Sequence, residues 1–357
     1  MSFIASRLIH WHHNHGRHHL PWKQNRDPYA VWLSEIMLQQ TQVNTVIPYY
    51  TRFMQAFPAI TSLAQAPLDD VLALWSGLGY YSRARNLHLA AQKIEQNHHG
   101  QFPAARTVIQ QLPGIGRSTA AAIAVFAFGQ QEAILDGNVK RIFARFFGIS
   151  GYPGEMRVQN LLWKKAEESL PVDHSSSAIE TYTQALMDLG ATVCTRRTPR
   201  CKSCPLQSQC VAFQEQLTDQ LPTAKPRKAL PQKETVFLLL LQQQKLLLQK
   251  RATSGIWGAL WCPPEIATGV DAADYCQHHL GIQVKQQPIE LPALDHQFTH
   301  FKLRIHPRLL HVVSDSRITE PESIWINPAD ALEQGIPAPV RKLLKQNFLS
   351  DNQTTRI

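Results

Sequence analysis

The spacing of apolar residues changes once along this chain of 357 residues, and that change limits the folds available to it. From Asp27 to about Gln220 apolar residues recur every three or four positions, which predicts helices. Residues 221–234 hold three prolines and four basic residues, a composition typical of a linker. From Thr235 short apolar runs flank polar turns, which predicts strands. We therefore expect an all-α domain over residues 1–220 and a smaller α/β domain over residues 235–350.

The charge balance favours an anionic partner. Lys and Arg outnumber Asp and Glu by 36 to 27, and the resulting formal charge of +9 suits nucleic acid. The first residues carry no apolar core of signal-peptide length, and the longest apolar runs are too short to span a bilayer, so we expect a soluble, cytoplasmic protein. Six histidines lie among the first 19 residues with mixed spacing, and we interpret them as a solvated segment without a function.

Four of the six cysteines lie close together, at Cys194, Cys201, Cys204 and Cys210. This C-x6-C-x2-C-x5-C spacing lets one loop, residues 194–210, surround a single metal centre, and four thiolates suit either zinc or an iron–sulfur cluster. Structural zinc loops usually present two close cysteine pairs, whereas this loop has one, so a four-iron, four-sulfur (4Fe-4S) cluster is favoured. Three arginines and a lysine inside the loop would let it rest on phosphates.

A tight turn between two helical stretches predicts a phosphate site. The run VIQQLPGIGRSTAAAIAVFAFG places Gly114 and Gly116 before an apolar helix that opens at Ser118. Glycine lets the backbone approach a partner closely, and the free N–H groups at a helix start favour an anion. We therefore expect a helix-hairpin-helix that holds a DNA phosphate.

Two carboxylates accompany this turn. Glu35 has mostly apolar neighbours on its face of a predicted helix, so desolvation should raise its pKa and suit it to act as a general acid. Asp136 follows the apolar helix beside the polar Asn138, where it should stay ionised. Two carboxyls with divergent pKa values suit bond cleavage through an oxocarbenium-like state. The alternative is that both are ordinary charges at helix ends.

Five motifs resemble those of one known family. In order across residues 20–210 they are LPWKQNRDPYAVWLSEIMLQQTQV, GLGYYSRARN, LPGIGRSTA, LDGNVKR and the cysteine loop. They resemble the MutY family of adenine DNA glycosylases, in the helix-hairpin-helix glycosylase superfamily. The resemblance implies a monomeric, monofunctional base-excision repair enzyme that removes adenine opposite 8-oxoguanine or guanine in duplex DNA. It also implies one 4Fe-4S cluster and a monovalent cation at the helix-hairpin-helix.

The resemblance implies roles for individual residues. Glu35 would protonate the adenine ring and then serve the attacking water, and Asp136 would stabilise the cationic sugar or its covalent adduct. The flipped adenine would meet one stacking ring and two side-chain amides, those of Trp22, Asn138 and Gln184.

Further matching positions would contact DNA. The wedge around the orphaned base corresponds to Gln40, Thr41, Leu78 and Tyr80. Flanking glycines favour an exposed loop tip for Tyr80. Lys140, about one helical turn after Asp136, is expected to contact phosphate. Ser118 stands where lyase relatives carry an amine, and its hydroxyl cannot form a Schiff base.

The second domain resembles the Nudix-like C-terminal domain of the same family, in FLLLLQQQKLLLQKRATSGIWGALWCPP and HQFTHFKLRI. The segment ATGVDAADYCQHHLGI lacks the paired glutamates that hold magnesium in working Nudix hydrolases, so we expect no pyrophosphate hydrolysis. The family's 8-oxoguanine recognition loop corresponds to Phe298, Thr299 and His300. Many members have Ser at the position of Thr299, which keeps the hydroxyl, so recognition should survive.

Two other functions fit part of the pattern. An endonuclease III-like bifunctional glycosylase and abasic-site lyase shares the hairpin, the aspartate and the cysteine loop. That family carries Lys in place of Ser118, however, and lacks Glu35 and the second domain. A non-catalytic iron–sulfur protein that binds DNA or senses redox state would gain nothing from two carboxylates beside phosphates.

Overall fold

The computed structural model describes residues 3–24, 26–226, 229–313 and 322–349. The predicted domain limits at residues 1–2 and 350, and residues 227–228 of the predicted linker, lie outside these ranges. No helix in the described ranges is long and apolar enough to cross a membrane.

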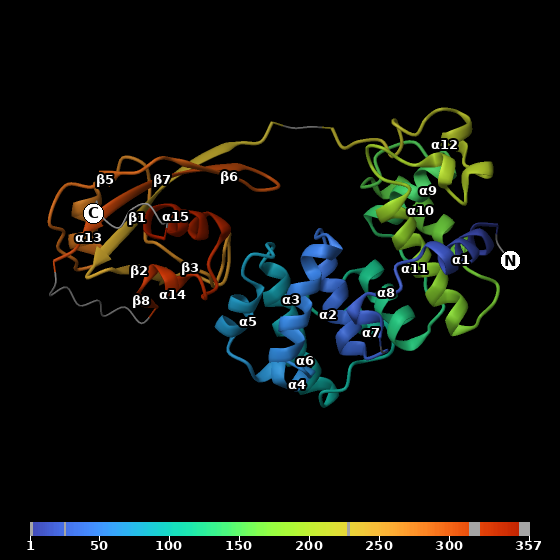
Figure 1. The fold of residues 1–357 in the computed structure, drawn as a ribbon, viewed down its shortest axis with the longest axis horizontal. Coiled ribbons are helices and arrows are strands. Elements are labelled where there is room, and N and C mark those ends of the chain that lie inside the picture. Colours follow the sequence, from blue (N-terminus) through green and yellow to red (C-terminus); the bar gives the residue numbers. More distant parts are fainter. Residues whose placement is uncertain (1–2, 25, 227–228, 314–321, 350–357) are drawn as a thin grey trace. The chain divides into compact units, whose positions relative to one another are not determined.

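The described residues divide into two compact units (Figure 1). Unit 1 lies within Met1–Gln65 and Asn86–Arg227, and unit 2 lies within Ala66–Arg85 and Lys228–Ile357. Residues 66–85, which the sequence pattern places in the helical domain, thus group with the C-terminal part of the chain.

Every described element before the linker is helical, which confirms the predicted all-α class of this part. The α-helices are α1 (Phe3–His15), α2 (Pro28–Leu38), α3 (Val43–Ala56), α4 (Ile60–Gln65), α5 (Leu68–Trp75), α6 (Ser82–His98), α7 (Arg106–Ile109), α8 (Arg117–Phe128), α9 (Gly137–Phe146), α10 (Met156–Glu168), α11 (Ser176–Thr192) and α12 (Val211–Gln214). Short 3-10 helices are η1 (Pro21–Lys23), η2 (Cys201–Ser203) and η3 (Gln207–Gln209).

The start of α2 follows from its sequence. Pro28 occupies the first turn, where its missing N–H costs nothing, and the Asp27 carboxylate accepts hydrogen bonds from the N–H groups of Tyr29 and Ala30. This cap fixes the phase of the helix, and therefore the direction in which Glu35 points.

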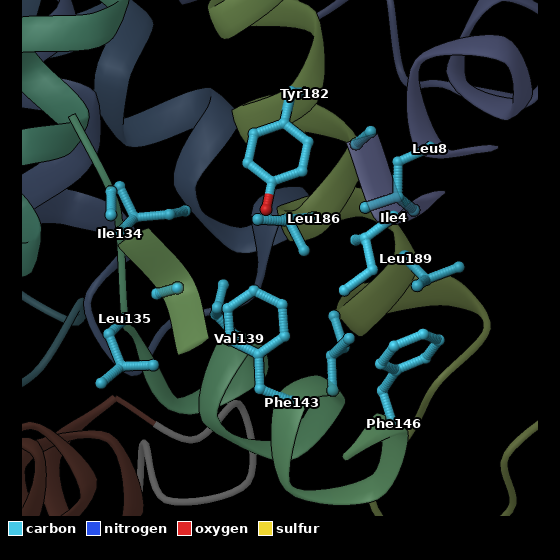
Figure 2. Close-up of a cluster of buried hydrophobic side chains, with 14 of the residues drawn as sticks. Ile4, Leu8, Ile134, Leu135, Val139, Phe143, Phe146, Tyr182, Leu186 and Leu189 are labelled. Carbon is cyan, nitrogen blue, oxygen red and sulfur yellow. The ribbon is translucent and has the colours of Figure 1, made fainter. Parts of the chain in front are cut away.

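One buried cluster joins α1, α9 and α11 (Figure 2). Ile4 and Leu8 of α1 and Phe143 of α9 are among its side chains, and all three are buried. Burial of each such side chain contributes about 1.5 to 3 kcal/mol. The cluster therefore holds α9, which begins just after Asp136, against α11, which carries Gln184.

Unit 2 contains an eight-stranded mixed sheet, which confirms the α/β class of the second domain. Its strands are β1 (Gln232–Gln242), β2 (Lys245–Lys250), β3 (Trp261–Cys262), β4 (Glu265–Ile266), β5 (Ile289–Glu290), β6 (Leu294–Gln297), β7 (Lys302–His311) and β8 (Ser323–Ile326). The helices after the linker are α13 (Ala272–His279), α14 (Pro328–Ala331) and α15 (Ala338–Phe348). The main path of the sheet runs β3-β2-β1-β7-β5.

The central pair β1 and β7 is parallel, with Gln232 opposite Lys302 and Leu241 opposite His311. A parallel strand covered on both faces needs a continuous apolar run, and β1 is buried from Thr235 to Leu240. Pairing with β7 also extends β1 back to Gln232, inside the predicted linker.

Candidate active site

A cavity of about 240 Å³ in unit 1 brings three predicted site residues together. It is lined by Trp22 of η1, Glu35 of α2 and Gln184 of α11, among others. Pockets for drug-sized ligands usually measure about 300 to 1,000 Å³, so this one suits a single ring system rather than a whole nucleotide. The Trp22 ring is buried and meets Tyr50 edge to face at 5.3 Å between centroids, which fixes its plane.

Glu35 presents its carboxyl to this cavity from an apolar stretch of α2. Val31 and Leu38, one turn before and after it, line the same space. Burial, and then the negative charge of Asp136, raise the pKa of Glu35 to about 8. At neutral pH Glu35 therefore holds a proton and is able to act as a general acid.

Asp136 caps α9, and its carboxylate accepts a hydrogen bond from Val139 N at 2.8 Å. Burial raises the pKa of Asp136 as well, so its expected ionised state depends on the groups that oppose this effect. The backbone N–H groups of Val139 and Asn138 and cationic side chains of α9 act against that rise. Since these donors favour the carboxylate of Asp136, the proton of the coupled pair resides on Glu35.

A pH profile tests this assignment. Because the acid form of Glu35 is required, the rate constant for base release should be near its maximum at about pH 7 and fall about tenfold per pH unit well above pH 8. Burial also lowers the pKa of Lys23, on the same cavity, to about 8. The Lys23→Arg variant stays charged throughout, so the same decline in that variant would assign it to Glu35. A rate that stays level to pH 10 would contradict the assignment.

Of the two amide side chains predicted to bind adenine, Gln184 lines the cavity and Asn138 does not. Gln184 is buried, lines the cavity, and donates from Nε2 to Asp188 Oδ1 at 2.9 Å. Asn138 is not among the described residues that line the cavity. Its Oδ1 accepts a hydrogen bond from Arg141 at 2.8 Å, and a Cβ on Gly190 would lie only 2.5 Å from the Asn138 Cβ. The side chain of Asn138 thus joins α9 to α11, away from the cavity.

The predicted hairpin joins α7 to α8. Gly114 has φ +79°, and a Cβ there would lie 2.8 Å from Asn86 Cβ, so only glycine fits. Gly116 caps α8, and a Cβ there would meet nothing within 4 Å. The N-cap residue Gly116 has no side chain to bind the first turn of α8, which favours an anion at the N–H groups of that turn.

Ser118 and Lys140 both lie near Asp136. The Ser118 Oγ accepts a hydrogen bond from Leu135 N at 2.9 Å, one residue before the carboxylate. The positive charge of Lys140 acts to lower the pKa of Asp136. Ser118 therefore supports the backbone at the site, while Lys140 supplies charge.

Two predicted wedge residues, Gln40 and Thr41, follow the end of α2. Gln40 is exposed and has φ +56°, a conformation that residues other than glycine adopt rarely. Thr41 is partly buried, and its N–H donates to Leu38 O at 3.2 Å.

The other two wedge residues lie in unit 2, after α5. Tyr80 is 47% exposed and has φ +49°, so the expected exposed loop tip is confirmed. Leu78 is only 6% exposed, so this conformation does not present its side chain to DNA as predicted. The Leu78 N–H donates to Trp75 O, which closes a tight turn and directs the side chain inward.

The C-terminal part of unit 2 anchors this loop. The hydroxyl of Tyr81 donates to Ile336 O at 2.8 Å and accepts from Gly77 N at 3.2 Å. Arg341 of α15 donates to the Ser76 Oγ at 2.8 Å. The backbone that carries Tyr80 is therefore held by residues more than 250 positions later in the chain.

The four clustered cysteines line one apolar cavity of about 30 Å³. Burial raises the pKa of the Cys204 thiol to about 12, and the charges of the other three sulfurs act in the same direction. Four bare thiolates would therefore be unfavourable here without a compensating cation. Arg145 donates to the Cys194 Sγ at 3.4 Å, a contact that favours a thiolate. In the described part of the chain no three His, Cys, Asp or Glu side chains form a group that would hold a single metal ion.

Comparisons with known proteins agree with this geometry. Residues 33–168 match the HhH-GPD superfamily of base excision DNA repair proteins, and residues 235–346 match the NUDIX domain. The adenine DNA glycosylase of Buchnera aphidicola subsp. Schizaphis graminum is 37% identical over 96% of this chain and 98% of its own length. The chain belongs to the MutY family of adenine DNA glycosylases.

Other relatives of this glycosylase support the same placement. The Homo sapiens adenine DNA glycosylase is 32% identical over 97% of this chain and 74% of its own. A thermostable thymine-DNA glycosylase aligns with a TM-score of 0.53 at 28% identity, over 59% of this chain and 95% of its own. A non-covalent endonuclease III–DNA complex, at 19% identity, shows the fold alone: its TM-score is 0.51, over 60% of this chain and 95% of its own. The protein is thus a DNA glycosylase of base excision repair.

The predicted recognition loop of the glycosylase lies at the turn between β6 and β7. Phe298 N donates to Phe301 O at 2.9 Å, and the two rings stack at 4.5 Å between centroids. Trp257 extends this aromatic group, with its ring 5.3 Å from that of Phe298. Thr299 and His300 are exposed, and the Thr299 Oγ1 lies 3.3 Å from the His300 Nδ1. A group of aromatic rings beside two exposed polar side chains suits contact with a nucleobase.

The sequence pattern missed the residues that support Gln184. Asp188 is fully buried, and its carboxylate is paired with Arg17 and approached by His12, which is also buried. The interpretation of the His-rich start as a wholly solvated segment is wrong at His12. The spacing of Asp188, four residues after Gln184, was the available signal.

Proposed function

We propose that this glycosylase releases adenine that stands opposite 8-oxoguanine or guanine in duplex DNA, and that it acts as a monomer in the cytoplasm. The observation that carries the proposal is a cavity for one ring system, lined by Trp22, Gln184 and Glu35, in which burial raises the pKa of Glu35 to about 8. An adenine turned out of the duplex would stack on Trp22 and meet the amide.

The proposed reaction follows from the two carboxyls. Glu35 gives its proton to a ring nitrogen of adenine, the glycosidic bond breaks with its electron pair leaving on the base, and Asp136 stabilises the cationic sugar. The Glu35 carboxylate then takes a proton from water, whose oxygen bonds to the sugar. Adenine and an abasic site result, and Glu35 is protonated again.

The remaining site residues would bind DNA around this chemistry. The N–H groups of α8 after Gly114 and Gly116 would hold a phosphate, with a monovalent cation at the same hairpin, and Lys140 would add a phosphate contact. Gln40, Thr41 and Tyr80 would surround the orphaned base, and Phe298, Thr299 and His300 would read it.

The cysteine loop would hold one 4Fe-4S cluster. Its ligands would be Cys194, Cys201, Cys204 and Cys210, which share one apolar cavity. The cluster would supply the positive charge that four buried thiolates need. It would also hold the basic loop of residues 194–210 in place for contact with phosphates.

A base-release assay tests the proposal. Four duplexes carry adenine opposite 8-oxoguanine, guanine or thymine, or carry thymine glycol. We expect release of adenine opposite 8-oxoguanine and guanine, and slow release opposite thymine. Activity confined to thymine glycol would instead favour the endonuclease III-like function.

Reading of the opposite base depends on the Thr299 hydroxyl. The Thr299→Val variant keeps the side-chain shape but loses the hydrogen bond, so the preference for 8-oxoguanine over guanine should fall about tenfold. Thr299→Ser, which keeps the hydroxyl, should retain the parental preference. A Val variant that discriminates as well as the parent would remove Thr299 from this role.

Ser118 predicts a monofunctional enzyme. The parent should leave an abasic strand that breaks only on alkali or heat, because a hydroxyl forms no Schiff base. Ser118→Lys should yield an adduct with the abasic strand that borohydride traps. Ser118→Ala is the matched control, since it loses the same hydrogen bond to Leu135 N without adding an amine. Cleavage by the parent without alkali, or no adduct from a folded Lys variant, would refute this prediction.

A further inference from the structure

Asp188 stands behind Gln184 on α11, completely buried. One carboxylate oxygen accepts hydrogen bonds from the Arg17 side chain, with Nε at 2.8 Å, and the other accepts from Arg17 N at 2.8 Å. The His12 Nε2 lies 3.4 Å from the second oxygen. The same first oxygen, Oδ1, accepts from Gln184 Nε2 at 2.9 Å.

These contacts determine which way the Gln184 amide faces. Burial alone would raise the pKa of Asp188, but the nearby His12 ring, the hydrogen bonds from Arg17 and the Arg17 charge outweigh it and lower the pKa to about 2. Asp188 is then a carboxylate that only accepts hydrogen bonds. Gln184 must turn its NH2 group toward Asp188, which leaves its carbonyl oxygen, Oε1, for the cavity.

We propose that Asp188 is a positioning residue that fixes the Gln184 amide with Oε1 toward the base, so that the cavity selects bases with a hydrogen-bond donor at that position. The 6-amino group of adenine is such a donor. A base with a carbonyl oxygen there would set two acceptors against each other. The inference rests on the proposed function, and it adds a reason why that cavity distinguishes adenine.

The test compares adenine with purine, the same ring without the 6-amino group. Each base is placed opposite the same partner, and its release is measured in single turnovers with the full-length protein. The Asp188→Asn amide donates as well as accepts, so Gln184 is free to turn over. The adenine-to-purine rate ratio should fall about tenfold relative to the parent, with purine release little changed. Intrinsic differences between the two bases cancel in this comparison of ratios.

A matched control and a second variant complete the test. Thr192 donates to the Asp188 backbone carbonyl at 2.7 Å, so Thr192→Val removes a neighbouring hydrogen bond without touching the carboxylate, and its ratio should stay parental. If Asp188→Asn does not fold, Asp188→Glu serves in its place, because it keeps the charge but moves the carboxylate by one methylene. The adenine-to-purine rate ratio of this variant should also fall.

Two results distinguish a failure of the positioning role of Asp188 from a failure of the proposed function. A folded Asp188→Asn or Asp188→Glu variant with the parental ratio, or with equal losses for both bases, would overturn the positioning role while leaving the proposed function intact. A parent protein that releases neither adenine nor purine from any duplex would overturn the proposed function, and this inference with it.

Discussion

Replacing Glu35 by Gln is expected to slow adenine release by about 10²- to 10⁴-fold while leaving affinity for the mispaired duplex nearly unchanged. The amide keeps the size and polarity of the side chain in the cavity but has no proton to give. Single-turnover base release and equilibrium binding to the same duplex measure the two effects separately. Near-normal release would remove Glu35 from its proposed role.

A stability measurement controls for damage to the fold. In the folded state the pKa of Glu35 is raised to about 8, so the folded protein retains a proton that the unfolded chain loses above its ordinary pKa near 4.5. Between these values the carboxyl lowers stability as pH rises, and the full cost is present above about pH 8. Glu35→Gln removes that cost, so at pH 8 the variant should unfold at the same temperature as the parent or a higher one.

Replacing Asp136 by Asn is the second large effect, with an expected loss of about 10²- to 10³-fold in base release. A neutral amide does not stabilise a cationic sugar. Asn is a good N-cap, so it preserves the hydrogen bond from Val139 N and with it α9. An Asp136→Asn variant as active as the parent would contradict the two-carboxyl mechanism.

The chain offers a matched control for this change. Asp271 caps α13 in unit 2 in the same way, with its carboxylate accepting from Asp274 N at 2.8 Å. Asp271→Asn makes the identical chemical substitution away from the site and should leave base release unchanged. Equal losses in both variants would show that the effect does not depend on the position of Asp136 at the site.

Local rules accounted for the parts of the site that lie within one element. The cap at Asp27, the buried face around Glu35 and the exposed position of Tyr80 all follow from neighbouring residues in the sequence. The rise in the pKa of Asp136 was not predicted, since desolvation there depends on the packing of the surrounding elements rather than on adjacent polar residues.

Contacts between distant segments account for the rest. Arg17 reaches Asp188 across 171 positions, and no spacing rule relates two such residues. The Asn138 side chain packs closely against Gly190 of another helix and does not line the cavity. Motif matching assigned Asn138 by its neighbours in the sequence, whereas its direction depends on how α9 packs against α11.

The anchoring of the Tyr80 loop by Ile336 and Arg341 limits what a deletion can reveal. Removing the chain after the linker would take away the loop proposed to recognise the opposite base and the supports of the Tyr80 loop together, so any lost discrimination would have two origins. The same holds for chimaeras. A C-terminal domain transplanted from a homologue would need groups that bind Ser76 and Tyr81, so the segment that carries these two residues would have to be exchanged together with it.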